Sequence, residues 1–220
     1  MGRAGTDKGI TTVLVDGGPG IALEGDLAVP ERARGIVLFA HGSGSSRRSP
    51  RNQFVARVLR EAGLGTLLFD LLTPREDAVY ETRFNIDLLA QRLAAATEWM
   101  TRQPIAASLG VGYFGASTGA AAALIAAADL GPAIGAVVSR GGRPDLAEAA
   151  LDRVTAPTLL IVGGLDDVVI DLNRQAYAGL RYEKRLVIVP GATHLFEEPG
   201  TLEEVARLAA DWFLQRLKNR

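Results

Sequence analysis

The stretch LGVGYFGASTGAAAALIAAADL (residues 109–130) decides the fold of this chain. It joins an apolar, β-rich run (109–114) to an alanine-rich, helix-favouring run (120–130) through Gly115-Ala116-Ser117-Thr118-Gly119. A serine on such a sharp strand-to-helix turn has its hydroxyl clear of the sheet, with a helix N-terminus directly behind it. The backbone at such a turn is strained, and the two glycines keep its neighbours small. The pattern Gly-x-Ser-x-Gly is weak evidence by itself, but here a predicted strand precedes it and a predicted helix follows it. Ser117 is therefore the predicted nucleophile.

Short apolar runs alternate with helical stretches through the rest of the chain. Further strands are predicted at 35–40, 64–72, 134–139, 158–163 and 185–190, and further helices at 52–62, 85–100, 146–151, 172–180 and 202–217. Such alternation produces right-handed βαβ units, and hence a mainly parallel sheet with helices on both faces.

The N-terminal part has a different pattern. Runs 11–16 and 21–29 are joined by Gly17-Gly18-Pro19-Gly20, which predicts an antiparallel hairpin at one edge of the sheet. No linker or repeat interrupts the chain, so we expect residues 1–220 to form a single α/β domain.

Composition excludes several classes of protein. The chain has no cysteine, which rules out disulfides, thiolate metal sites and a cysteine nucleophile. Its formal net charge of −1, without blocks of like charge, argues against nucleic acid or an anionic membrane as a partner. The polar stretch Met1 to Ile10 contains no apolar segment typical of a secretion signal, and no apolar run predicts a membrane span. We therefore expect a cytoplasmic enzyme or binding domain.

Ser117 requires a base, and the chain has 2 histidines. His194 follows the last predicted strand, in Gly191-Ala192-Thr193-His194, where a loop of small residues brings its imidazole to the edge of the sheet that binds ligands. The segment GGLDDVV (163–169) follows the preceding strand and offers Asp166 and Asp167 to orient that imidazole. The order serine, aspartate, histidine is that of α/β-hydrolases.

On these motifs the chain resembles an α/β-hydrolase, most closely the small, cap-less members of the dienelactone hydrolase-like group, over nearly all of its length after residue 20. The resemblance implies the α/β-hydrolase fold. It also implies an acid at the fourth position of Gly-x-x-Asp-x-x-Val, which is Asp166, with Asp167 as the alternative. Dienelactone hydrolases proper use a cysteine nucleophile, so the serine here argues against dienelactone as the substrate.

The resemblance further implies an oxyanion loop at His41-Gly42-Ser43-Gly44-Ser45, with the backbone N–H groups of Ser43 and Thr118 as donors. The predicted function is a serine hydrolase that cleaves small carboxylic esters, thioesters or lactones through an acyl-enzyme, without metal or cofactor. The alternatives are a non-catalytic small-molecule binding protein of the same fold, and a cofactor-free lyase or perhydrolase. The chain is expected to act as a monomer or homodimer.

Three further residues are candidates for contact with substrate. His41 is interpreted as a locally hydrogen-bonded residue of the oxyanion loop, with an alternative role as base. Arg140, like Arg143, is expected either to form an ion pair with Asp145, Asp166 or Asp167 or to recognise a substrate carboxylate. Phe196 is a candidate lining residue of the acyl pocket. The charged stretch 73–84 is the candidate for a loop that overhangs an otherwise open site.

Overall fold

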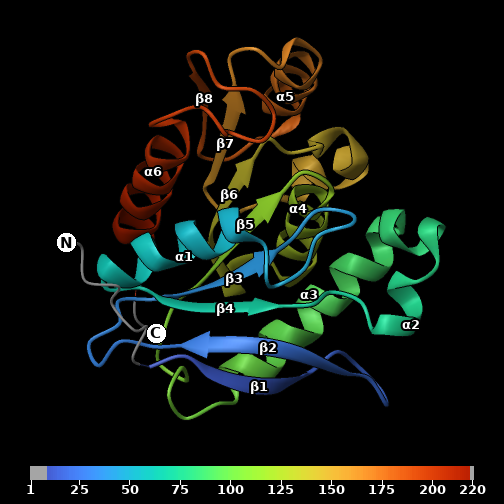
Figure 1. Ribbon diagram of the computed structural model, residues 1–220, viewed down its shortest axis with the longest axis vertical. Coiled ribbons are helices and arrows are strands. Elements are labelled where there is room, and N and C mark those ends of the chain that lie inside the picture. Colours follow the sequence, from blue (N-terminus) through green and yellow to red (C-terminus); the bar gives the residue numbers. More distant parts are fainter. Residues whose placement is uncertain (1–8, 219–220) are drawn as a thin grey trace.

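The computed structural model describes residues 9–218, whose strands all join one sheet in the order β1-β2-β4-β3-β5-β6-β7-β8 (Figure 1). The polar N-terminal residues 1–8, which carry most of the prediction about a secretion signal, lie outside this range. The strands are β1 (Thr11–Asp16), β2 (Ala22–Ala28), β3 (Ile36–Ala40), β4 (Gly65–Phe69), β5 (Val111–Ala116), β6 (Ile134–Arg140), β7 (Thr158–Gly163) and β8 (Lys184–Val189).

Strand β2 pairs antiparallel with β1 and β4, and the other pairs are parallel. The prediction of a mainly parallel sheet with an antiparallel N-terminal hairpin is therefore confirmed. The helices are α1 (Pro50–Glu61), α2 (Pro74–Asp77), α3 (Ile86–Thr101), α4 (Thr118–Leu130), α5 (Asp167–Gly179) and α6 (Thr201–Arg216). The 3₁₀ segments are η1 (Tyr80–Phe84), η2 (Gly131–Ala133) and η3 (Pro144–Arg153).

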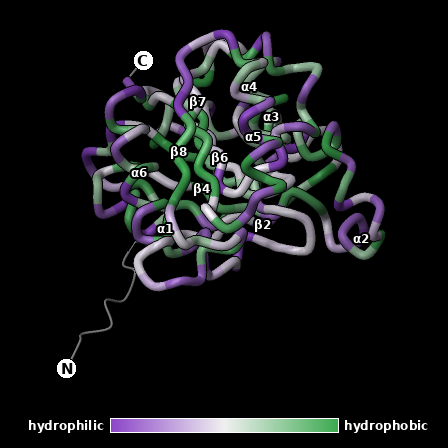
Figure 2. The backbone as a smooth tube through the Cα atoms, turned by 90° about the horizontal axis from the view of Figure 1, so that it is seen from above, coloured by the Kyte–Doolittle hydropathy of each residue, from purple (hydrophilic) through white to green (hydrophobic). Residues whose placement is uncertain are grey.

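Helices cover both faces of the sheet, as predicted. Figure 1 shows α1 and α6 on one side and α3 and α4 on the other. Alternate side chains of each strand feed two separate cores: Val37 and Phe39 pack in the layer of α1 and α6, whereas Leu38 packs in the layer of α3 and α4. The central strands are buried on both sides, which explains their continuous hydrophobic sequence (Figure 2).

Several helices begin earlier than their hydrophobic periodicity predicts, as α1 and α5 illustrate. Helix α1 begins at Pro50, because the Ser49 hydroxyl accepts a hydrogen bond from the Asn52 amide at 3.4 Å and proline favours the first helical position. Helix α5 begins at Asp167, five residues before the predicted start at Leu172. The first turn of α1 is polar and gives no apolar signal, whereas the first turn of α5 belongs to the segment 163–169 that was interpreted as the loop carrying the acid. The predicted helix at 146–151 is instead part of the 3₁₀ segment η3.

The charged stretch 73–84, predicted as an overhanging loop, contains α2 and η1. Helix α2 carries a capping box, in which Thr73 and Glu76 satisfy each other's backbone amides. Arg92 of α3 fixes this segment through an ion pair with Glu76 at 2.7 Å. Figure 2 places α2 at the margin of the molecule.

No helix within residues 9–218 has both the length and the apolar character needed to cross a membrane.

Candidate active site

Ser117 lies between the end of β5 and the start of α4, with φ 51° and ψ −122°. This positive φ is unfavourable for a residue with a side chain, and it turns the serine out of the sheet. A Cβ added at Gly119 would lie 2.2 Å from the Ala40 carbonyl oxygen, and one at Gly115 would lie 2.5 Å from Ala120 Cα. Both flanking positions therefore exclude any side chain, as the sequence analysis anticipated.

Asp166 and His194 are in direct contact. Asp166 Oδ2 lies 2.7 Å from His194 Nδ1, and the two side chains are 17% and 37% exposed. Asp166 occupies the N-cap position of α5, where an aspartate commonly accepts a bond from its own helix, yet it makes no such bond. Its carboxylate faces the imidazole instead. In the part of the chain that the structure describes, Asp167, in the first turn of α5, forms neither a hydrogen bond nor an ion pair with His194.

The His194 ring lies beside the turn that contacts Ser117. A Cβ on Gly141 would lie 3.5 Å from both Nδ1 and Cε1 of this ring. The neighbouring Arg140 carbonyl accepts the Ser117 amide at 3.3 Å, and the Arg143 amide donates to the Ser117 carbonyl at 3.1 Å. Within residues 9–218 no hydrogen bond joins Ser117 Oγ to His194. Such bonds are often long before substrate binds.

The loop after β3 approaches Ser117 closely. A Cβ on Gly42 would lie 3.1 Å from Ser117 Cβ. The Ser43 amide, predicted as an oxyanion donor, donates at 2.9 Å to the hydroxyl oxygen of Thr118. Thr118 itself begins α4, where backbone amides have no partner within the helix. The two predicted donors are thus neighbours, and the Thr118 hydroxyl oxygen already accepts the hydrogen bond of the Ser43 amide.

Both ring nitrogens of His41 bind the backbone. Nδ1 lies 3.0 Å from the Gly42 carbonyl oxygen, and Nε2 accepts the Leu71 amide at 3.1 Å. Burial lowers the pKa of His41, although the Gly42 carbonyl and the nearby Asp70 carboxylate oppose this effect. These contacts are those of a neutral residue that supports the oxyanion loop.

Arg47 is a supporting residue that sequence reasoning missed. Its amide donates to Asp70 Oδ1 at 2.8 Å, and its buried guanidinium contacts Asp70, Glu24 and Asp26. These contacts fasten the oxyanion loop to β2 and to the end of β4. The available sequence signal was Asp70, a carboxylate at the end of a predicted strand. No local pattern pairs Asp70 with Arg47, which lies 23 positions earlier.

The ion pair expected as one alternative for Arg140 is wrong. Arg140 is 5% exposed, and within the described chain its only hydrogen-bond acceptor is Asn52 Oδ1, 3.2 Å from Nη2. Its Nε atom is buried without a partner. Residues 139 and 140 point to opposite faces of β6, so Arg140 lies in the layer of α1, while Asp145 belongs to the first turn of η3. Burial, with repulsion from Arg51, lowers the pKa of Arg140 to about 10.

Arg143 and Phe196 have different surroundings from Arg140. Arg143 forms the expected ion pair with Asp145 at 2.7 Å. Phe196 is 1% exposed, has φ 55°, and lies with its ring centre 5.9 Å from the Arg140 guanidinium carbon. It packs in the core beneath the loop that carries His194. Contact of Phe196 with a substrate therefore stays a prediction.

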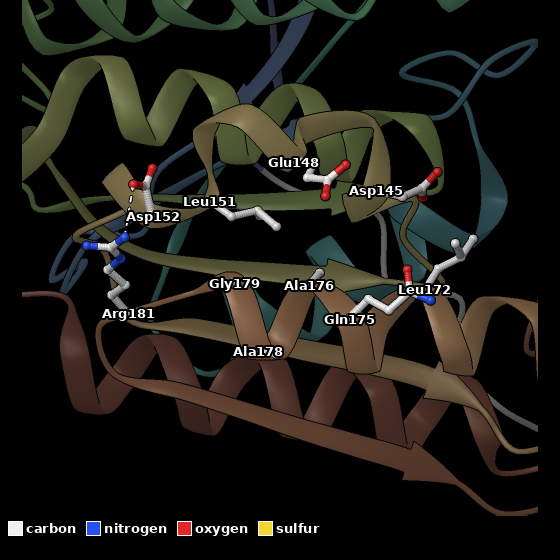
Figure 3. Close-up of a pocket in the computed structure, with 10 residues that line it drawn as sticks. All are labelled: Asp145, Glu148, Leu151, Asp152, Leu172, Gln175, Ala176, Ala178, Gly179 and Arg181. Carbon is white, nitrogen blue, oxygen red and sulfur yellow. Dashed lines mark ion pairs between the residues drawn. The ribbon is translucent and has the colours of Figure 1, made fainter.

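A cavity of about 410 Å³ adjoins the oxyanion loop. It is lined by apolar residues of β2 and the segment after β4, and by His41, Ser45, Ser46, Arg47 and Asp70. A second cavity, of about 400 Å³, lies between η3 and α5 (Figure 3). Its walls carry Glu148 and the Asp152–Arg181 ion pair, and contain neither Ser117 nor His194. Ser117 and His194 are also absent from the lining of the cavity beside the predicted oxyanion loop.

The sheet order, the strained serine after β5 and the aspartate–histidine contact after β7 and β8 define the class of this protein, which is the α/β hydrolases. Residues 56–218 match the sequence model of the Dienelactone hydrolase family. The chain belongs to the dienelactone hydrolase family.

Solved structures agree with this assignment at the level of the family or of the fold. The crystal structure of a dienelactone hydrolase from Anabaena variabilis is 56% identical, with a TM-score of 0.91 over 95% of this chain and 99% of that chain. Est1E from Butyrivibrio proteoclasticus, 17% identical with a TM-score of 0.79 over 94% of this chain and 98% of that chain, shares the fold.

A Mycobacterium tuberculosis protein named "Putative phosphoribosyl transferase" is 62% identical over 93% of this chain. The match covers 46% of that protein. This chain therefore spans about half the length of the curated relatives that it matches most strongly.

Proposed function

We propose that this protein is a serine hydrolase that cleaves carboxylic esters, with Ser117 as nucleophile, His194 as general base and Asp166 as the acid that orients it. The contact of 2.7 Å between Asp166 Oδ2 and His194 Nδ1, beside a strained Ser117, carries this proposal. Membership of a hydrolase family supports it. Thioesters and lactones remain within its scope, because they react through the same tetrahedral chemistry.

Each residue has a defined task in the reaction. Asp166 holds the His194 Nδ1–H, which leaves Nε2 to accept the Ser117 proton as Oγ attacks the carbonyl carbon. The tetrahedral intermediate collapses to an acyl-enzyme, and His194 returns the proton to the departing alcohol. Water then attacks the acyl-enzyme by the same route, and the acid is released.

The amides of Ser43 and Thr118 are the proposed donors to the oxyanion. Each such donor is worth about 3 kcal/mol in the transition state. The Ser43 amide now donates to the Thr118 hydroxyl at 2.9 Å, so an oxyanion must replace that hydroxyl as its acceptor.

A fluorophosphonate probe tests the nucleophile directly. The folded wild-type chain is expected to gain one covalent adduct on Ser117, and esterase activity on p-nitrophenyl acetate is expected to disappear in parallel. Ser117→Ala should abolish labelling, whereas Ser45→Ala, on the oxyanion loop, should label normally. A folded wild-type chain that is not labelled contradicts the proposal and favours a non-catalytic binding protein. Product analysis separates ester hydrolysis from lyase or perhydrolase chemistry.

A further inference from the structure

Asn173 is a fully buried polar side chain on helix α5 that has no part in the proposed reaction. Its amide nitrogen donates two hydrogen bonds, one to the Val169 carbonyl of its own helix at 2.8 Å and one to the Gly142 carbonyl at 3.0 Å. Its amide oxygen is buried and has no partner among residues 9–218. An unsatisfied buried acceptor is unfavourable, so an apolar side chain would serve packing alone better than asparagine does. The bond to Gly142 is the contact that a packing role leaves unexplained.

The short turn after β6, which we call the 141–143 turn, lies between the nucleophile and the base. Its last residue, Arg143, donates its backbone amide to the Ser117 carbonyl at 3.1 Å. Its first residue, Gly141, lies beside the base, because a Cβ there would be 3.5 Å from two atoms of the His194 ring. The carbonyl of its middle residue accepts the hydrogen bond from α5. The turn therefore contacts the backbone of the nucleophile and also the ring of the base.

The helix that carries Asn173 also carries the proposed acid. Asp166 occupies the N-cap position of α5, and its carboxylate contacts His194 at 2.7 Å. Asn173 lies about two helical turns further along the same helix. One side-chain amide thus joins the helix that orients the base to the turn that contacts the base. Within residues 9–218 no hydrogen bond joins Ser117 Oγ to His194, so their relative position depends on links of this kind.

The other sides of the 141–143 turn are packed closely. A Cβ on Gly142 would lie 2.0 Å from the buried Ser139 hydroxyl oxygen and 2.6 Å from Ala120 Cβ on α4. The turn therefore lies directly against β6 and α4, and the hydrogen bond from Asn173 fixes it to α5. Loss of that bond leaves the Gly142 carbonyl without its side-chain donor and frees the turn to shift relative to α5.

We propose that Asn173 is a positioning residue that acts through the 141–143 turn. Its hydrogen bond to the turn keeps the His194 ring aligned between Asp166 and Ser117. The inference rests on the proposed hydrolase function and adds a residue to it, one that touches no reacting atom and takes no proton. Such a residue acts on the chemical step, because a small misplacement of the base lowers the rate and leaves the binding of substrate almost unchanged.

Steady-state kinetics on p-nitrophenyl acetate test this role. Asn173→Leu removes both hydrogen bonds and keeps a side chain of similar size; it should lower kcat at least about tenfold and change KM less than about twofold. Thr97→Val is the matched control. Thr97 is also buried, bonds the Leu93 carbonyl of its own helix at 2.8 Å and lies 2.6 Å from the Tyr113 hydroxyl outside that helix. Its replacement should keep kcat within about twofold of the wild type, because none of its partners contacts the base.

A double-mutant cycle separates positioning of the base from a general loss of structure. In Asp166→Asn the His194 ring has already lost its carboxylate, so adding Asn173→Leu should lower kcat further by less than about threefold. Asn173→Thr is the second variant, because a threonine hydroxyl can still bond the Val169 carbonyl four residues earlier but is too short to replace the bond to Gly142. It should lose as much activity as Asn173→Leu. Thermal unfolding establishes that each variant is folded.

The two proposals fail separately. The inference is wrong if the folded leucine variant, or the threonine variant where leucine prevents folding, loses less than about tenfold in kcat. It is also wrong if the loss is as large in the Asp166→Asn background as in the wild type. In both cases the hydrolase proposal stands as long as Ser117 is labelled by the fluorophosphonate. A folded wild-type chain that is neither labelled nor active on the ester overturns the hydrolase proposal itself, and this inference with it.

Discussion

Arg140→Met is expected to make the protein more stable. Burial and repulsion from Arg51 lower the pKa of Arg140 to about 10, well below the usual range of an arginine. At about 1.4 kcal/mol for each pH unit, this lowering corresponds to roughly 3 kcal/mol of destabilisation of the charged form in the folded state. Because the lowered pKa belongs to a cation, the destabilisation is fully present below about pH 10 and is relieved only as the pH rises above that value. The whole penalty therefore applies at pH 7.

Two favourable contacts of Arg140 reduce the expected gain. Its hydrogen bond to Asn52 is worth about 1 kcal/mol, and its position over the Phe196 ring is worth about 0.5 kcal/mol. Methionine fills most of the space left by the arginine stem. The net gain is then about 1–2 kcal/mol, which corresponds to a rise of roughly 2–8 °C in Tm for a domain of this size.

Urea unfolding at pH 7 and 25 °C, without added anions, measures the difference in the free energy of unfolding. Arg153→Met is the matched control, because Arg153 is exposed and pairs with Asp129 at the surface, and it should change stability by less than about 0.5 kcal/mol. A loss of more than about 1 kcal/mol in Arg140→Met would refute the reasoning. The guanidinium would then be a net stabilising group in the absence of any ligand.

Two further predictions concern the groups around Ser117. Asp166→Asn should lower kcat by about 10⁴-fold on p-nitrophenyl acetate, because the His194 tautomer is no longer fixed, whereas Asp167→Asn should change kcat by less than about tenfold. The reverse ranking would transfer the acid role to Asp167. His41→Gln should weaken the loss of stability on acidification: the lowered pKa keeps folded His41 neutral, so unfolded chains bind the extra proton as pH falls through 6.5. Urea unfolding at pH 7 and pH 5 measures how much the free energy of unfolding falls on acidification, in the wild type and in His41→Gln. An equal fall in the two proteins would exclude this effect.

The parts of the fold and site that could be predicted are those encoded in contiguous residues. The turn at Ser117 has its strand, its glycines and its helix within one run, and Asp166 and His194 each directly follow a buried strand. The sheet edge then brings these strand ends together without further information. This explains why the contact between Asp166 and His194 was anticipated although the two residues are 28 positions apart.

Features that depend on side chains from separate layers could not be predicted. The expected ion pair of Arg140 ignored the alternation along β6, which directs residue 140 toward α1 and away from Asp145. The partner Asn52 begins the helix predicted at 52–62, but its contact with Arg140 was missed because a polar side chain gives no apolar signal that it faces inward. Segment 73–84 was taken for a loop because its stability comes from a capping box and from Arg92, not from apolar periodicity.

The unfavourable features of this molecule gather at one edge of the sheet. Ser117 and Phe196 are the two residues other than glycine with positive φ within residues 9–218, and both adjoin Arg140. Most of the buried polar atoms that lack partners in this range also lie around the ends of the parallel strands or the helices that follow them. Packing elsewhere would tolerate none of these features without compensation, and strain of this kind is retained where it has a function. The concentration therefore supports a functional role for this edge of the sheet, where Ser117, the proposed nucleophile, lies on a strained turn.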